Sequence, residues 1–361
     1  MRIGIVTFPV DRSTNYGCVM QNYALQRVIQ KLGHAPKTLR LADIIPTKSQ
    51  SLLEKIHISK KTKGIPNVTT PLTSFCEKFI SFTDTLYLPV KPGKLSHENF
   101  DAYIAGSDQI WRPSLTHHHF LKYAMLDFTA SINVTRIAYA ISFGQATWSL
   151  PRKILFYRLR KLISRFAAIS MREEEGQEYS KKYLKITAPQ QVMDPTLLLT
   201  QDDYMPLTTG VTAENHLVSY ILDDTPEKKS AIDRLFLNGH FTGRCDFTIK
   251  KTAEKRQPTM EDWLTAFKTA KLIVTDSYHG TAFAILFRRP FITIANNSRG
   301  LARFFSLLEK LNLTDCLVSS PNDISSDVLN KHLDFDAVHK RLEVEREKSL
   351  LFLSQALAKK T

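Results

Sequence analysis

Short apolar runs that end in small or polar residues recur along the first half of the chain. The first run, at 2–8, is rich in β-branched residues and predicts a buried strand. A segment with helical apolar spacing follows at 19–32 and ends at Gly33, a residue suited to a helix C-terminus. This order of strand, loop and helix is typical of an open α/β domain. Further strands are predicted at 101–105, 136–141, 167–170 and 191–193.

The same alternation begins again after about residue 200. Thr259 is a good N-cap, and the acidic residues at 261 and 262 suit the first turn of the helix that it would open. A long amphipathic helix over 337–360 closes the pattern. The other elements predicted here are strands at 216–222, 271–275 and 290–294, a helix at 227–237 and a helix that ends at Arg289.

We therefore predict an α/β protein with two Rossmann-like domains that face each other across a cleft. The first domain takes up 1–200 and the second 201–336. A polar, lysine-containing segment at 43–73 is predicted to be an insertion with some helix. Ligands of such folds bind where the carboxyl ends of the strands converge, so the site is expected between the domains.

The C-terminal segment, 337–361, is predicted to pack back on the first domain. A helix lying on a membrane surface is the alternative for an amphipathic segment of this kind. Packing is preferred because Glu343, Glu345 and Glu347 would oppose an anionic lipid surface.

Composition narrows the class of protein. The chain has 361 residues, of which 43% are hydrophobic and 23% charged, and this excludes a wholly disordered protein. No apolar run reaches the roughly 18 residues of a membrane span, and the apolar start is too short for a signal peptide. The four cysteines are widely scattered, which argues against a zinc site or a disulfide framework and favours a reducing cytosol.

The formal net charge of +14 calls for an explanation. Nucleic-acid binding is disfavoured, because the only dense basic run is Lys60–Lys63 in a predicted loop. Anionic substrates and the anionic inner leaflet of a membrane fit scattered charge better, and simple solubility explains it equally well.

The loop that joins the first strand to the first helix carries candidate binding residues. Gly17 would let the backbone approach a ligand, and the helix N-terminus offers free N–H groups to an anion. Asn15 and Gln21 can hydrogen-bond sugar hydroxyls. The loop lacks the glycines of a dinucleotide-binding turn, and a plain turn with a helix cap is the alternative.

Three further polar clusters follow predicted strands. Gly106–Trp111 combines polar residues with an aromatic, Ser170–Glu173 contains an arginine, and Asp276–Thr281 contains a histidine near a helix start. Taken singly, Arg172 would be a surface ion-pair partner and His279 a helix-capping residue.

Other polar or aromatic positions have plain structural interpretations. Asp194 precedes a proline and is interpreted as a turn former. His117–His119 are consecutive and so are interpreted as an exposed loop rather than a metal site. Trp111 suits either sugar stacking or the core.

In their order and spacing these segments resemble the polysaccharide pyruvyl transferase family. The resemblance extends from the first strand to about Phe304. It is carried by N-Y-G-x-x-x-Q at 15–21, G-S-D-Q-I-W at 106–111, R-I-A-Y-A-I-S-F-G at 136–144, S-x-R-E at 170–173, D-P-T-L-L at 194–198 and T-D-S-Y-H-G-T at 275–281.

The resemblance implies transfer of the pyruvyl group of phosphoenolpyruvate onto two hydroxyls of a sugar, which forms a cyclic ketal and releases phosphate. It also implies a fold similar to the two-domain GT-B glycosyltransferases, and no metal or organic cofactor. The first domain would bind the acceptor and the second the donor. Members serve the assembly of capsule, exopolysaccharide or cell-wall polymers.

The family's functional residues map onto a small set of positions. Arg172 matches its strand-end arginine and is the first candidate clamp for the anionic donor. Arg299 is the second clamp and Arg303 the reserve. His279 would protonate the methylene carbon or stabilise the departing phosphate.

The base that accepts the hydroxyl proton is left open among Asp276, Asp108 and Glu173. The full set of substrate-binding candidates is Asn15, Tyr16, Gly17, Gln21, Gly106, Ser107, Asp108, Gln109, Ser142, Phe143, Glu173, Ser277, Gly280, Thr281 and Arg303.

The expected partners are phosphoenolpyruvate and a glycan acceptor, taken to be a lipid-linked oligosaccharide with a galactose-type sugar. A cytoplasmic protein in peripheral contact with the inner face of the membrane would meet both. Two other functions remain open: a GT-B glycosyltransferase that uses a nucleotide-sugar, and a non-catalytic glycan-binding subunit of a polymer-assembly complex.

Overall fold

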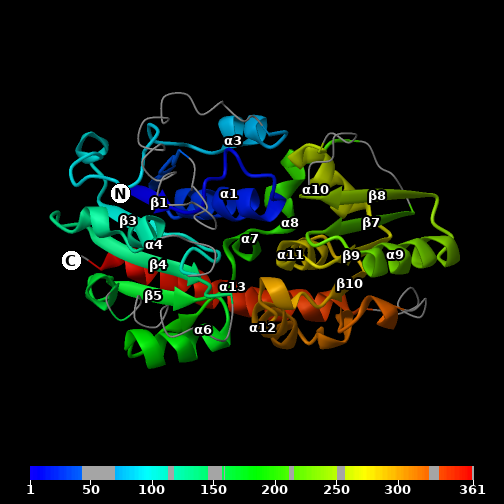
Figure 1. The fold of residues 1–361 in the computed structure, drawn as a ribbon. Coiled ribbons are helices and arrows are strands. Elements are labelled where there is room, and N and C mark those ends of the chain that lie inside the picture. The colour runs from blue at the N-terminus through cyan, green and yellow to red at the C-terminus, as the bar shows by residue number, and fades with distance from the viewer. Residues whose placement is uncertain are drawn as a thin grey trace, which may run out of the picture.

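Two parallel sheets, each flanked by helices, make up the computed structural model (Figure 1). The structure describes residues 1–42, 70–112, 118–144, 157, 159–210, 215–249, 257–324 and 333–359. The predicted insertion therefore lies outside the described residues up to position 69, as do the basic run Lys60–Lys63 and His117. The two-domain α/β architecture predicted from the sequence is confirmed.

The first sheet has six strands in the order β2-β1-β3-β4-β5-β6. All of its pairings are parallel, and five of its strands overlap predicted apolar runs. The strands are β1 (Arg2–Val6), β2 (Ala35–Thr38), β3 (Ala102–Ala105), β4 (Thr135–Ile141), β5 (Ala168–Met171) and β6 (Gln190–Gln191).

The second sheet has five parallel strands in the order β11-β10-β9-β7-β8. They are β7 (His216–Ile221), β8 (Gly243–Thr248), β9 (Leu272–Thr275), β10 (Phe291–Ile294) and β11 (Leu317–Val318). The sequence did not predict β2, β8 or β11. The first two mix polar with apolar residues, and β11 has only two residues, both partly exposed.

The helices begin and end with recognisable local signals. Thr259 caps α10 with a reciprocal Thr259–Asp262 capping box, as predicted. Gly33, at φ +81°, follows the end of α1 in the left-handed region that glycine tolerates. The helices are α1 (Tyr16–Lys31), α3 (Thr73–Phe79), α4 (His118–Ala124), α6 (Glu174–Tyr179), α7 (Pro195–Leu198), α8 (Gln201–Tyr204), α9 (Pro226–Asn238), α10 (Met260–Thr269), α11 (Tyr278–Leu286), α12 (Ala302–Leu311) and α13 (Phe335–Ala358).

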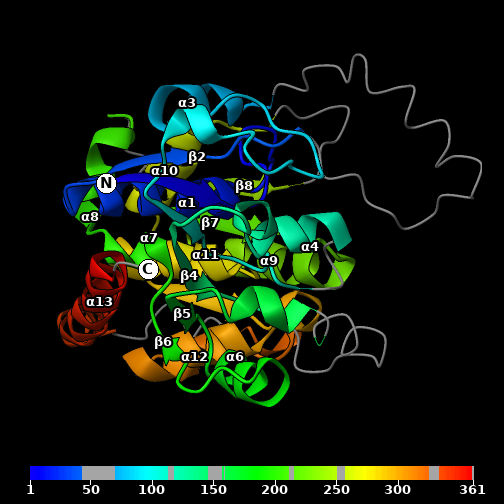
Figure 2. The ribbon, with the colours of Figure 1, turned by 90° about the vertical axis from the view of Figure 1, so that its left-hand side faces the viewer.

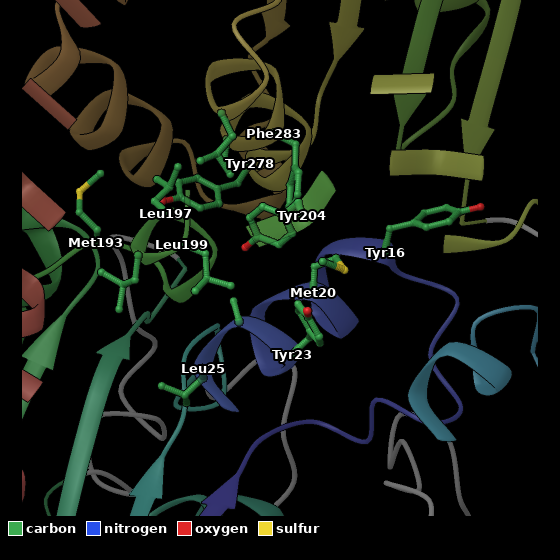
Figure 3. Packing of buried hydrophobic residues seen from close by; sticks show 14 of the residues in the cluster. Tyr16, Met20, Tyr23, Leu25, Met193, Leu197, Leu199, Tyr204, Tyr278 and Phe283 are labelled. Atoms are coloured by element: carbon green, nitrogen blue, oxygen red, sulfur yellow. The ribbon is translucent and has the colours of Figure 1, made fainter. Parts of the chain in front are cut away.

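One hydrophobic cluster joins the two domains (Figure 3). Tyr16 reaches from the start of α1 into the second domain, where its ring stacks on Trp263 at 5.3 Å and its hydroxyl donates to the Pro258 carbonyl. Tyr23 of α1 lies beside Tyr204 of α8, with the ring centroids 6.4 Å apart. Because aromatic rings of this size bury large apolar areas, these contacts fix the domains against each other.

Helix α13 crosses from the second domain to the first (Figure 1), and it is seen nearly end-on in Figure 2. Near its start, His339 Nε2 contacts the Ile285 carbonyl at 2.9 Å. Near its end, Ser349 Oγ accepts from the Met193 amide, and Phe352 packs on Tyr139 of β4. The helix therefore braces the two domains by contacts at both of its ends.

Candidate functional site

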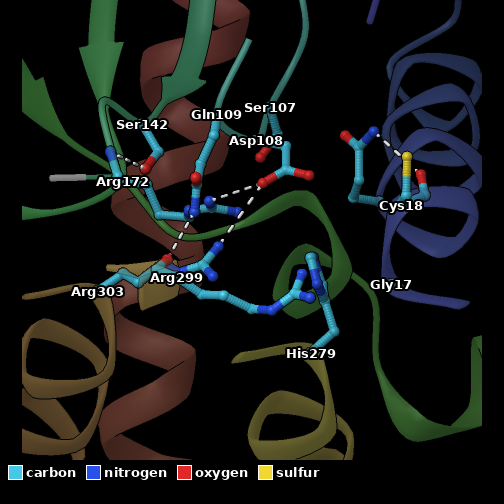
Figure 4. Close-up of polar contacts among 12 residues, drawn as sticks. Gly17, Cys18, Ser107, Asp108, Gln109, Ser142, Arg172, His279, Arg299 and Arg303 are labelled. Carbon is cyan, nitrogen blue, oxygen red and sulfur yellow. Dashed lines mark hydrogen bonds and ion pairs between the residues drawn. The ribbon is translucent and has the colours of Figure 1, made fainter. Parts of the chain in front are cut away.

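Polar side chains converge between the domains, where β3, β4 and β5 end on one side and α11 begins on the other (Figure 4). This is the edge of the first sheet at which ligands of open α/β folds bind. The sequence-predicted residues Ser107, Asp108, Arg172, His279 and Arg303 meet here.

Arg172, one residue beyond β5, is held by two carboxylates. Its Nη1 donates to Asp194 Oδ2 at 2.7 Å and its Nη2 to Asp108 Oδ1 at 3.1 Å. Only 1% of the side chain is exposed, and its Nε has no hydrogen-bond partner. The two carboxylates outweigh the cost of burial and raise the pKa of Arg172, so the guanidinium is a fixed buried cation.

Asp194 is the centre of the network, a role that the sequence did not suggest. Its Oδ1 accepts from the amide and hydroxyl of Thr196 and so caps α7, as a turn residue would. Its Oδ2 accepts from Arg172 and from Ser107 Oγ and lies 3.6 Å from His279 Nε2. Burial opposes ionisation, but His279 and Arg172 hold the pKa of Asp194 well below its usual value.

His279 lies in the first turn of α11 and is packed against the first turn of α1. A Cβ atom added to Gly17 would lie 2.2 Å from His279 Nδ1, so only glycine lets the two helices approach this closely. The buried Nε2 has no hydrogen-bond partner. Gly17 therefore acts by making room for the imidazole between the domains.

Arg303, in the first turn of α12, is the second buried cation of the site. Its Nη1 lies 3.7 Å from Asp108 Oδ1, and its Nε has no hydrogen-bond partner. The Tyr278 ring lies close to both guanidiniums, with its centroid 4.8 Å from the guanidinium carbon of Arg172 and 5.5 Å from that of Arg303. Burial, aided by repulsion from Arg172, lowers the pKa of Arg303 to about 10. An anion in the site would relieve this cost.

Arg299 is engaged in the second domain. Its Nε and Nη2 donate to the two oxygens of Asp223, both at 2.7 Å, in a bidentate pair that the sequence did not predict. Its hydrogen bond to this carboxylate raises the pKa of Arg299. The side chain is 30% exposed, so an anionic ligand could reach it only in competition with Asp223.

Two side chains of the first domain hydrogen-bond the loop that carries Arg299. Gln109 Nε2 donates to the Arg299 carbonyl at 2.8 Å, and Arg112 Nη2 donates to the Ser298 carbonyl at 3.0 Å. A Cβ on Gly300 would lie 2.0 Å from the carbonyl oxygen of Gly144, so this glycine permits the close approach. The predicted site residue Gln109 therefore binds a backbone carbonyl of the second domain and holds the two domains together at this point.

The three candidate bases differ in what occupies their oxygens. Asp276 accepts from the amides of Leu222 and Asp223, from Asn296 and from Lys228 Nζ, and so is fully engaged. Asp108 faces Arg172 and Arg303. Glu173 accepts from the Phe143 amide through Oε1, whereas its buried Oε2 has no partner. It lines a small cavity with Arg303, Gly144 and Gly300.

Several other candidates have structural roles. Asn15 caps α1, Ser277 caps α11, Thr281 bonds the Ser277 carbonyl, and Gly280 packs against Thr275. Tyr16 belongs to the domain interface, Gly106 packs beside Leu25, and Ser142 Oγ accepts from the Gly144 amide. Gln21 donates to Thr7 and keeps a buried, unpartnered Oε1. Trp111 is a core residue, fully buried with its ring N–H on the Ala124 carbonyl.

Several buried polar atoms without a hydrogen-bond partner belong to the residues of the predicted site, although other such atoms, for example Arg40 Nε and Trp263 Nε1, lie elsewhere in the described chain. Those of the site residues are Arg172 Nε, Arg303 Nε and His279 Nε2 on the donor side, and Glu173 Oε2 and Gln21 Oε1 on the acceptor side. Because buried polar groups in native proteins are almost always hydrogen-bonded, this set marks a ligand site. In the described part of the chain, no group of three or more histidine, cysteine or acidic residues could hold a metal ion. None of the four cysteines forms a disulfide.

Comparison with solved structures identifies the class of fold. A putative UDP-N-acetylglucosamine 2-epimerase from Listeria monocytogenes superposes with a TM-score of 0.51 at 10% identity, covering 98% of this chain and 90% of that one. A glycosyltransferase from Streptomyces sp. SF2575, complexed with thymidine diphosphate, gives 0.51 at 9%, covering 99% and 100%. The chain therefore has the two-domain α/β fold of GT-B glycosyltransferases and such epimerases.

The family model for polysaccharide pyruvyl transferase matches residues 15–298. The chain belongs to this family, as its motifs predicted. No protein among the curated ones matches it. None of the described helices is long and apolar enough to cross a membrane.

Proposed function

We propose that the protein transfers the pyruvyl group of phosphoenolpyruvate to two hydroxyls of a glycan sugar, with release of phosphate, in polysaccharide biosynthesis. The observation that carries this proposal is the pair of buried guanidiniums of Arg172 and Arg303 beside His279, each with an unpartnered nitrogen. Phosphoenolpyruvate brings a carboxylate and a phosphate, and arginine N–H groups bind both kinds of oxyanion strongly.

The residues of the site divide the chemistry between them. His279, as imidazolium, gives a proton to the methylene carbon, and a sugar hydroxyl adds to the neighbouring carbon as Glu173 takes its proton. Phosphate then leaves beside the guanidiniums of Arg172 and Arg303, and the second hydroxyl adds to the same carbon to close the ketal. Its proton passes to the now neutral His279, and the protonated Glu173 gives its proton to the departing phosphate, so both residues return to their starting states. Glu173 is the preferred base because its Oε2 is unoccupied whereas the oxygens of Asp276 are engaged.

The acceptor in this proposal is a lipid-linked oligosaccharide with a galactose-type sugar, and phosphoenolpyruvate is the only donor. Neither a metal nor an organic cofactor enters any step, and the reaction is assigned to the cytoplasm. The first domain binds the acceptor, since it contributes Glu173 and Gln21, whose free oxygens can accept from sugar hydroxyls.

Ligand-dependent unfolding tests the donor without the acceptor. A ligand at about 100 times its Kd adds about 2.7 kcal/mol to the free energy of unfolding. We expect phosphoenolpyruvate to raise the melting temperature, and nucleoside diphosphates and nucleotide-sugars to leave it unchanged. A shift with one nucleotide and none with phosphoenolpyruvate would assign the protein to the glycosyltransferases and end the proposal.

A further inference from the structure

A broad groove lies on the first domain at the N-terminal end of β5, whereas Arg172 follows the C-terminal end of the same strand. Its volume is about 870 Å³, within the range of ligand pockets. The helical segment at 159–163, the start of β5, the chain before β6 and the last turns of α13 form its walls. Figure 1 shows the end of α13 beside β4 and β5.

The floor of the groove is apolar. Ile163, Leu184 and Phe352 are buried beneath it. Phe166 and Ile169 also line it and remain partly exposed, although β5 is hydrogen-bonded to strands on both sides. Apolar side chains at the start of an inner strand are normally covered by other parts of the protein. In this groove they remain exposed, and such a surface favours the binding of an apolar group.

The rim of the groove is cationic. Arg160, Lys161, Lys185 and Lys359 line it, and no acidic residue is among the described residues that do so. The guanidinium of Arg160 lies 5.4 Å above the ring of Tyr157, which is 68% exposed. An apolar floor under an unopposed cationic rim is complementary to a molecule with an acyl chain and a phosphate.

We propose that this groove docks the protein on a bilayer by binding an anionic phospholipid. The acyl chain lies on the floor, and the phosphate meets the lysines and arginine of the rim. Tyr157 then lies at headgroup level, where tyrosine is favoured in membrane proteins. The proposal does not depend on the reaction, but it would place the enzyme where a lipid-linked acceptor is found.

Vesicle co-sedimentation tests the groove. The wild-type protein is mixed with vesicles of phosphatidylcholine alone or with 30 mol% phosphatidylglycerol. The test variant is Lys161→Glu/Lys185→Glu and the control is Lys229→Glu/Lys271→Glu, which changes the net charge equally at exposed lysines of the second domain. Each basic residue near an anionic surface contributes about 1 kcal/mol, so the test variant should bind anionic vesicles at least about 30-fold more weakly.

The control variant should bind the anionic vesicles as the wild type does, and all proteins should bind neutral vesicles weakly. The binding of Lys161→Gln/Lys185→Gln should lie between that of the wild type and that of the test variant. Unchanged melting temperatures confirm that the variants are folded. The proposal would be overturned if the wild type bound both vesicle types equally, or if the control variant lost as much binding as the test variant. It would also be overturned by a dimer in sedimentation that disappears in the test variant, or by displacement from vesicles by millimolar inorganic phosphate at constant ionic strength.

Discussion

Replacing Arg303 with methionine should weaken donor binding without destabilising the fold. Methionine keeps much of the length and apolar volume of the side chain but removes its charge. In the structure the Arg303 guanidinium is paired with Asp108 at a distance of 3.7 Å, and burial lowers the pKa of Arg303 from its usual value to about 10. A displacement of this size means that the charged form costs roughly 3 kcal/mol in the folded state.

Arg172→Met supplies the contrast. Arg172 is the partner of both Asp194 and Asp108, at 2.7 and 3.1 Å, and its removal leaves two buried carboxylates without their main counter-ion. Breaking a buried pair in this way costs about 3–5 kcal/mol. We therefore expect Arg172→Met to lower the free energy of unfolding by that amount, and Arg303→Met to leave it unchanged or raise it by up to about 3 kcal/mol.

Urea unfolding at pH 7, with and without phosphoenolpyruvate, measures both quantities. Loss of one partner of a buried charge pair costs about 2–5 kcal/mol of binding, so Arg303→Met should raise the Kd at least about 30-fold. If Arg303→Met is as unstable as Arg172→Met, Arg303 is a structural counter-ion of Asp108. If it is stable and binds phosphoenolpyruvate as the wild type does, the site assignment is wrong.

Two further substitutions test the centre of the network. Gly17→Ala should displace the His279 ring, lower stability by about 1–3 kcal/mol through overpacking and weaken phosphoenolpyruvate binding, whereas Gly210→Ala, which has nothing within 4 Å of the added Cβ, should change neither in the same melting and binding assays. Asp194→Asn keeps the cap of α7 but removes the buried charge, so it should cost about 3–5 kcal/mol at pH 7. Because the pKa of Asp194 is lowered in the folded state, its contribution is fully present above about pH 4 and is lost only as pH falls below that value. In urea unfolding the difference between the variant and the wild type should therefore be constant from pH 7 to about pH 4.5 and should narrow by up to about 1.4 kcal/mol per pH unit between about pH 4 and pH 2. A stability difference that stays constant down to about pH 2 would show that the Asp194 charge is not responsible.

The fold could be predicted from the sequence because most of its strands are fully buried apolar runs. β4 and β9, for example, are buried along their whole length, and each is followed by a polar cluster at the sheet edge. The strands that were missed lack this signal. β2 reads Ala-Pro-Lys-Thr, and its place in the sheet is set by its pairing with β1 rather than by its own side chains.

The site was predicted less completely, because local signals describe only local roles. The Asp194-Pro195 pair correctly predicts a cap, but the same carboxylate also meets Arg172, which is 22 positions away in the chain. In the same way Ser277, Gly280 and Thr281 carry a strong motif, yet they shape the start of α11 and do not point an unoccupied polar atom at the cleft. Their contribution to the site is the placement of His279.

The three arginines of the site differ in how strongly carboxylates already bind them. Arg172 binds Asp194 and Asp108 through its two terminal nitrogens, whereas its Nε has no partner, and its main effect is to hold the two carboxylates in place. Arg299 is bound to Asp223 by two nitrogens and lies at the exposed edge of the cleft. Arg303 is buried, its ion pair with Asp108 is long, and Arg172 repels its charge. A bound anion would offset the free-energy cost of keeping Arg303 charged. An anionic donor should therefore gain most of its binding energy from Arg303, the residue that the sequence ranked behind Arg299.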